Sequence, residues 1–330
     1  MNALAQSILL DTVNTKIETI PMYSLASAMH LVHKFSGSPT TEQIDAFQKG
    51  PYSVDSYAMT QTNTAEFPEG LVRKDLDTYY DWSKFNCVYK DGNHIRLTLE
   101  TAFSSQWEIP FPTVTRAPFT NMDGTVSDTD VMCFTEEDVE RIERENQENG
   151  DSNDSFLCTK YKTSTVLTKK FRNGVEAQFI LPDVGVDIVR DYTTIVSDLK
   201  LWEHSKIVKA TRVVIPKLEH TTEFSVSDFM KRTGHFDTFW NTDGRSGFFS
   251  KLLSDPAYHV KLVSFDYKAK LVMDENGSTF ETELGMDCEV DRGCGGPMIH
   301  DYIPFDLTRP YLVRFLYQGT ELLLSAIKSM

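Results

Sequence analysis

The sequence lacks clustered positive charge. Among its 330 residues, 48 are Asp or Glu and only 33 are Lys or Arg, so the formal net charge is −15. Grooves for nucleic acid and patches for anionic membranes need clustered cations, and neither class of partner is expected. Long apolar runs are also missing, because the stretches near Leu312 and Leu322 are short and interrupted. The sequence therefore predicts no membrane span.

Cysteine is scarce and scattered, with five thiols at positions 87, 133, 158, 288 and 294. An odd number without regular spacing predicts no disulfide framework. Cys288 and Cys294 are close enough in sequence to pair or to chelate, but two reduced thiols are the expected state. The first residues lack a basic region and soon reach Asp11, so no cleaved signal peptide is expected and a cytoplasmic location is favoured.

The common signatures of catalysis are also absent: no Gly-x-Ser-x-Gly, phosphate-binding glycine loop, His-Glu-x-x-His or Cys-x-x-Cys occurs. His30 and His33 could present two ligands from one helix, but no carboxylate or thiol partner stands nearby, so no metal site is expected. The acidic neighbours of Cys288 disfavour a reactive thiolate. We predict a protein that is not an enzyme and has no cofactor.

One segment of the chain, residues 273–290, alternates with a period of two. Mostly apolar side chains occupy one parity: Ser278, Phe280, Thr282, Leu284, Met286, Cys288 and Val290. The other parity carries Thr279, Glu281, Glu283, Gly285, Asp287 and Glu289. This pattern is typical of a half-buried β-strand and is not needed in an exposed loop.

The rest of the chain predicts one mixed α+β domain, residues 1–330, without internal repeat or linker. Helices are expected over residues 1–34 and in the first half of the acidic stretch 136–155, with Glu140 and Arg144 paired at i,i+4. The second half of that stretch is expected to be a surface loop. Strand patterns occupy residues 58–67, 85–103, 178–181, 211–215, 260–263, 268–272 and 311–315.

Six separated stretches follow one another in a familiar order. They are residues 24–44, residues 101–132 with Trp107-Glu-Ile-Pro-Phe111, Phe179-Ile-Leu-Pro-Asp183, residues 215–236 with Ile215-Pro-Lys217, residues 267–278, and Phe305-Asp-Leu-Thr-Arg-Pro-Tyr-Leu-Val313. Together they resemble motifs of the serpin superfamily. The resemblance implies a large mixed central sheet, smaller sheets behind it and helices in the N-terminal third. It also implies that Trp107 and Phe111 are buried near the top of the large sheet.

Serpins inhibit by offering a loop to a protease and inserting the cleaved loop as a new central strand of the main sheet. The resemblance places the start of that hinge at Glu275, Gly277 and Ser278. The following positions, which are small in inhibitors, are here Thr279 to Glu283, including Phe280.

The resemblance also identifies the region where the sheet opens. Ser24 and Trp107 match the family pattern there. Leu99 and Tyr267 stand at positions where the family has an asparagine and a histidine that hydrogen-bond to each other. Replacing both partners can leave stability unchanged while altering how easily the sheet opens, and ordinary drift of the core is an equal alternative.

Two segments differ in length from the family pattern. The interval from Gln43 to Trp107, with its shortened 45–100 region, is too short for all the usual helices, and a helix covering the main sheet is the leading candidate for deletion. The interval from Ser278 to Pro310 is a few residues longer than usual. The compact frame suggests a viral, poxvirus-type origin by analogy.

Three functions remain open, all with a protein partner of unknown identity. In the first, the protein is non-inhibitory and binds proteins while Ser278 to Val290 is inserted in the main sheet, with residues 291–304 long enough to return. In the second, it inhibits proteases with Asp291 (caspase- or granzyme-like targets) or Arg292 (trypsin-like targets) as bait. Phe280 would then cost about 1–3 kcal/mol of overpacking on insertion. In the third, it is a scaffold without loop function.

Overall fold

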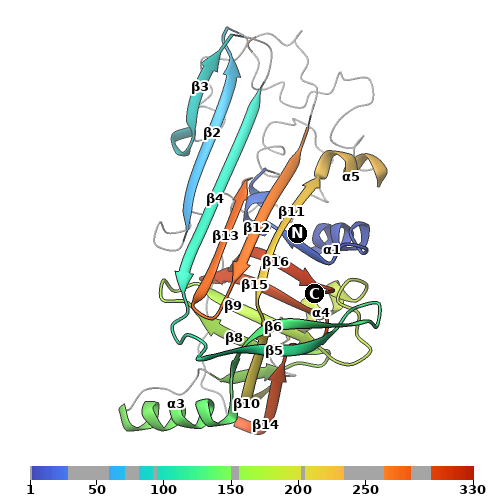
Figure 1. Ribbon diagram of the computed structural model, residues 1–330. Coiled ribbons are helices and arrows are strands. Elements are labelled where there is room, and N and C mark those ends of the chain that lie inside the picture. Colours follow the sequence, from blue (N-terminus) through green and yellow to red (C-terminus); the bar gives the residue numbers. More distant parts are fainter. Residues whose placement is uncertain are drawn as a thin grey trace.

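The computed structural model describes residues 2–28, 59–70, 82–91, 95–149, 156–201, 205–233, 254, 264–283 and 299–330. Two β-sheets dominate these residues (Figure 1). The six-stranded sheet has the order β11 (Leu218–Ser225), β12 (Asp266–Met273), β13 (Gly277–Glu283), β4 (Arg96–Gln106), β2 (Thr60–Pro68) and β3 (Asn86–Lys90). It is mixed, because β2 and β3 run parallel while the other neighbours are antiparallel.

The ten-stranded sheet lies behind and below the first in Figure 1. Its order is β1 (Ile17–Ile20), β16 (Thr320–Ile327), β15 (Tyr311–Tyr317), β9 (Glu176–Pro182), β8 (Ser164–Lys170), β7 (Leu157–Lys160), β10 (Lys206–Pro216), β6 (Val126–Phe134) and β5 (Thr113–Thr120). Strand β14 (Ile299–Asp306) pairs with β10 in parallel. The helices are α1 (Asn2–Asp11), α3 (Glu136–Asn149), α4 (Tyr192–Asp198), α5 (Val226–Arg232), the 3₁₀ turn η3 (Trp82–Lys84) and residues 22–28.

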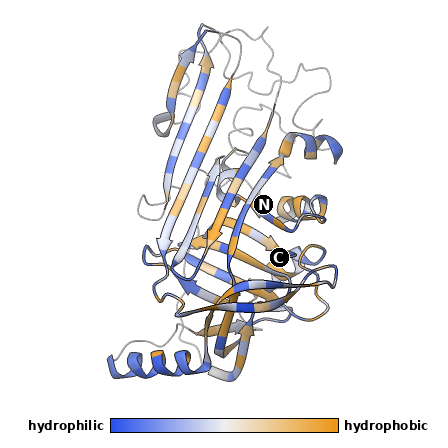
Figure 2. Cartoon of the chain, in the orientation of Figure 1, coloured by the Kyte–Doolittle hydropathy of each residue, from blue (hydrophilic) through white to orange (hydrophobic). Residues whose placement is uncertain are grey.

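Hydropathy explains how the sheets pack. Strands β15 and β16 are apolar over most of their length (Figure 2) and are largely buried, as expected for strands that are covered on both faces. Strands β4 and β12 alternate between buried and exposed residues, so the six-stranded sheet presents one face to the core and one to solvent. Both α+β class and large mixed sheet agree with the sequence prediction.

Most predicted elements occur where the sequence placed them, with three corrections. The predicted helical region 1–34 contains a strand, since Ile17–Ile20 are all buried and pair with β16. Helix α3 extends to Asn149 after a capping box in which Thr135 and Asp138 bond reciprocally. Arg144 bonds the carbonyl oxygen of Glu140 instead of its carboxylate, which corrects the predicted ion pair.

The outer face of the six-stranded sheet is polar at its centre. Only five residues, 91–95, connect β3 to β4, so this connection has no room for a helix that crosses the sheet. The exposed side chains of β4 and β13 there are small or polar: Glu100, Ala102, Ser104, Thr279 and Glu281. This face is therefore suited to contact with water.

A buried lysine lies on a strand of the ten-stranded sheet, among aromatic side chains. Lys169 on β8 is only 3% exposed, and its amine lies 4.7 to 5.6 Å from the ring centres of Phe111, Phe134 and Phe156. Burial lowers the pKa of Lys169 to about 8, while Glu108 opposes the shift. The charged amine is thus held mainly by aromatic faces.

We predict that Lys169→Met stabilises the protein at pH 7. The folded pKa lies below the unfolded value, so burial of the charge costs stability below pH 8, and this cost fades as pH rises toward 10.5. The expected gain is about 2 kcal/mol at pH 7 and much less at pH 10. Urea unfolding at both pH values measures it. The control is Lys170→Met, which replaces the exposed neighbouring lysine. An equal gain at both pH values would contradict the prediction.

Candidate functional site

The candidate site is the hinge strand β13 and the residues around it. Gly277–Glu283 lies between β4 and β12 and is antiparallel to both (Figure 1). On the buried face, the register pairs residues of the same type: Phe280 lies opposite Phe103, and Thr282 lies opposite Thr101. The buried side chains of β13 are therefore of the same kind as those of β4 beside them.

Phe280 is the main anchor of the hinge strand. It is 1% exposed, stacks on Phe103 with ring centres 4.8 Å apart, and meets the edge of Phe315 at 5.3 Å. Phe315 belongs to β15, so this contact joins the two sheets. The overpacking cost expected for Phe280 assumed a site shaped for alanine. The structure corrects that expectation, because the site is lined by aromatic rings.

Three buried hydroxyl groups hold the far part of the hinge. Ser24 lies 2.9 Å from Thr282 and 3.4 Å from Thr101, and these two threonines also hydrogen-bond to each other. The three come from the 22–28 helix, β13 and β4. Each hydroxyl thereby has a partner in a place where an unpaired one would cost free energy.

The turn into β13 is fixed at several points. Trp107, which is fully buried, donates from its indole to the carbonyl oxygen of Asp274 at 2.8 Å. Glu275 pairs with Lys217 at 2.6 Å, and this hydrogen bond lowers the pKa of the Glu275 carboxyl and raises that of the Lys217 amine. A Cβ atom on Gly277 would lie 2.2 Å from the carbonyl oxygen of Ser105, so only glycine fits there.

Leu99 and Tyr267 lie immediately beyond the paired part of β13. Glu283 is the last hinge residue in the ladder, opposite Glu100 and Lys268. Leu99 is buried, whereas Tyr267 donates its hydroxyl to Glu18 at 2.8 Å. The position of Tyr267 thus keeps a hydrogen bond, with a partner on β1 that the sequence did not reveal.

Comparison with solved structures bears on this arrangement. Native tengpin, a thermophilic serpin, matches with a TM-score of 0.70 and 15% identity over 100% of this chain and 93% of that chain. Cleaved Serpin 42Da gives 0.68 at 11% identity, covering 100% and 95%. Native Arabidopsis AtSerpin1 gives 0.68 at 16% identity, covering 99% and 95%. The chain has the serpin fold. No family model and no curated protein matches it by sequence.

The matched serpins are in different conformational states. Tengpin in its latent state gives a TM-score of 0.64, and a loop-inserted cleaved ovalbumin mutant gives 0.69. The TM-scores are similar for native, latent and cleaved serpins. They show the shared fold and do not indicate how far the loop of this chain is inserted. The recognition of a serpin-type fold from six motifs is confirmed.

Several predicted residues fall outside the described part of the chain. The bait candidates Asp291 and Arg292 and the hinge residue Leu284 are among them. So are the histidine pair, both cysteines of the loop and the expected strand 260–263. The described hinge residues Glu275, Gly277, Ser278, Phe280 and Thr282 lie together at the site, with Trp107 at one end and Ser24 near the other.

The predicted strand from Ser278 to Val290 is described as far as Glu283, and residues 284–290 lie outside the described part of the chain. Strand β14 starts at Ile299, beyond the end of the sheet at which β13 begins (Figure 1). A strand to Val290 would extend about 43 Å from Gly277, while nine steps to Ile299 span at most about 32 Å. The chain from Val290 to Ile299 is therefore shorter than such a strand, because β14 already includes the last six residues of the expected return through residues 291–304.

The described residues hold no group of three or more histidine, cysteine, aspartate or glutamate side chains placed to bind a metal ion. None of the helices in those residues is long and apolar enough to cross a lipid bilayer.

We predict that Phe280→Ala destabilises the protein by about 3–5 kcal/mol, because it leaves a cavity between Phe103 and Phe315. The free energy of unfolding in urea measures the effect. Thr279→Ala is the matched control, since Thr279 is the exposed neighbour on the same strand, and a change within about 0.5 kcal/mol is expected. Similar losses in both variants would show that Phe280 does not anchor the hinge.

We predict that Gly277→Ala displaces the hinge strand, since the new Cβ atom would overlap the Ser105 carbonyl oxygen. The expected cost is on the order of 3 kcal/mol. Hydrogen exchange should show faster exchange for residues 277–283 than in the unsubstituted protein, while β15 and β16 keep their protection. Unchanged protection of residues 277–283 would contradict the close approach.

Proposed function

We propose that this protein is a non-inhibitory member of the serpin-fold proteins that acts by binding a protein partner, with its hinge kept as a permanent strand. The observation that carries the proposal is the burial of Phe280 between Phe103 and Phe315 in the uncut chain. An inhibitor of this fold needs its loop free until cleavage. Here the loop's first seven residues already belong to the sheet.

Withdrawal of the hinge would be costly. It would expose the Phe280 ring and leave a hole against Phe103 and Phe315, a loss comparable to about 3–5 kcal/mol for Phe→Ala in a core. It would also separate Thr282 from Ser24 and Thr101. These losses support a hinge that stays inserted.

The segment between Glu283 and Ile299 is the proposed contact region for the partner. Its sixteen steps can span at most about 56 Å, of which about 20 Å is needed to return along β13. A segment of this length can present a binding sequence, including Asp291 and Arg292, while remaining tied at both ends. We propose a protein partner on this basis and on the basis of the shared fold.

Protease inhibition is the second candidate, and one observation favours it. The alternate positions that are buried in the hinge continue in the sequence as Leu284, Met286 and Val290. Of these, Val290 lies further along the chain than the uncut loop can insert while β14 stays paired. In the observed register, Leu284 would come opposite Leu99 and Tyr267. A cut between Asp291 and Arg292 would remove the tie to β14 and allow insertion as far as Val290.

Incubation with trypsin, granzyme B and caspases, followed by denaturing gel electrophoresis, tests the two candidates. We predict cleavage products without a stable high-mass adduct. We also predict that the cleaved protein melts only a few degrees higher than the intact one, because Phe280 is already buried before cleavage.

The variants Asp291→Ala and Arg292→Ala are the controls, because each removes one bait residue and leaves the described sheet unchanged. An adduct that either variant abolishes, with a large rise in melting temperature on cleavage, would establish the inhibitor instead.

A further inference from the structure

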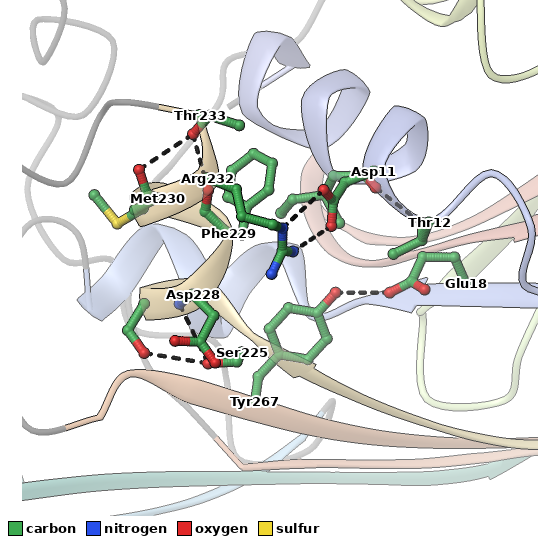
Figure 3. Close-up of polar contacts among 12 residues, drawn as sticks. Asp11, Thr12, Glu18, Ser225, Asp228, Phe229, Met230, Arg232, Thr233 and Tyr267 are labelled. Carbon is green, nitrogen blue, oxygen red and sulfur yellow. Dashed lines mark hydrogen bonds and ion pairs between the residues drawn. The ribbon is translucent and has the colours of Figure 1, made fainter.

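A buried polar cluster joins the two sheets beside the hinge. Figure 3 shows Tyr267 pointing from β12 toward Glu18 on β1, with the hydroxyl donating to Oε1 at 2.8 Å. Glu18 is 2% exposed and Tyr267 is 3% exposed. The bond therefore connects a central strand of the six-stranded sheet to an edge strand of the ten-stranded sheet, away from solvent.

Tyr267 occupies the point at which the sheet must open to admit more of the loop. It is the first residue of β12 beyond the ladder with β13, which starts at Lys268 and Glu283. Its ring stacks on Phe224 of β11 at 5.4 Å. Any further separation of β12 from β4 would have to move this ring relative to Glu18.

The surroundings of Glu18 contain one opposite charge and few other titratable groups. Lys328, 1% exposed, follows β16 and donates to the carbonyl oxygen of Thr12 and to Thr15, the latter at 2.9 Å. Asp11 at the end of α1 pairs with Arg232 of α5 at 2.6 Å. From β11, the titratable group on the same face as Thr222 and Phe224 is His220; burial lowers its pKa, and a hydrogen bond with the Ile17 backbone opposes the shift.

We propose that the Glu18–Tyr267 hydrogen bond is a pH-dependent tie that holds β12 on β1 and controls how readily the six-stranded sheet opens beyond Glu283. When Glu18 is ionised, the bond is charge-assisted and roughly twice as strong as a bond between neutral groups. When Glu18 takes up a proton, β12 keeps only the weaker bond.

The acid–base properties of the cluster place this change near neutrality. Burial raises the pKa of Glu18 to about 7, and the Tyr267 bond and Lys328 charge partly offset the rise. Burial lowers the pKa of Lys328 to about 8. The Tyr267 bond lowers the pKa of Glu18 in the closed sheet, so this bond favours the ionised carboxylate and is weakened when Glu18 takes up a proton. Acidification through pH 7 therefore reduces the share of the resistance to opening that the Tyr267 bond supplies.

Hydrogen exchange of the unsubstituted protein and of Tyr267→Phe, compared at each pH from 8 to 5.5, tests the proposal. The ratio of the two rates cancels the intrinsic pH dependence of exchange. For the amides of β12 and β13, we expect about fivefold faster exchange in Tyr267→Phe at pH 8 and less than twofold at pH 5.5. Tyr302→Phe, which removes an exposed hydroxyl, is the control and should give a ratio near one.

Glu18→Gln provides the second variant, because its amide oxygen can accept the same bond without a charge that titrates. The exchange rates of Glu18→Gln and of the double variant Glu18→Gln/Tyr267→Phe are compared at each pH. Their ratio should not change with pH, because no carboxyl group remains at position 18 to titrate. A ratio for Tyr267→Phe that stays constant from pH 8 to 5.5 would overturn the proposal. Persistence of the pH dependence in Glu18→Gln would also overturn it and would identify another group, such as His220.

Discussion

The contact between Phe280, Phe103 and Phe315 is the interaction on which the rest of the site depends. It places the largest hinge side chain between the two sheets, and the ring stack extends through Phe171 to Trp107. A strand anchored in this way fixes the register of its neighbours, because a slip of one residue would move Glu281 into the aromatic core. The position of every other hinge residue follows from that register.

The three polar features of the hinge are arranged around this anchor. At one end, the Glu275–Lys217 pair and the Trp107 bond hold the turn. At the other, hydroxyl groups satisfy one another where a strand end would leave polar atoms buried without partners. Phe280 supplies apolar burial, and the polar contacts supply position. Together these contacts hold all seven residues of the strand in register.

Much of this site could be predicted from the sequence, because alternation reports on which face of a strand is buried. Thr101-Ala-Phe103 and Phe280-Glu-Thr282 mirror each other, so an antiparallel pairing of like residues was present in the sequence. The strand at Ile17–Ile20 was not evident, since four residues without alternation suit a helix equally well. The partner of Tyr267 was also hidden, because a lone glutamate 249 positions away carries no local sign of burial. The limit on insertion needed the start of β14, which no pattern within the loop reveals.

The pairing of β14 with β10 has a kinetic consequence. Each residue added to β13 shortens the remaining connection and lengthens the path that it must cover, so the slack falls by about two residue lengths per step. In the uncut chain, insertion of the loop into the sheet can therefore advance no further than about residue 288. Further movement would require β14 to leave β10, to which it is joined from Ile207↔Ile299 to Val214↔Asp306. Such a conversion would break many hydrogen bonds together, so it should be a slow, all-or-none event, and a gradual advance of the strand should stop at a fixed position.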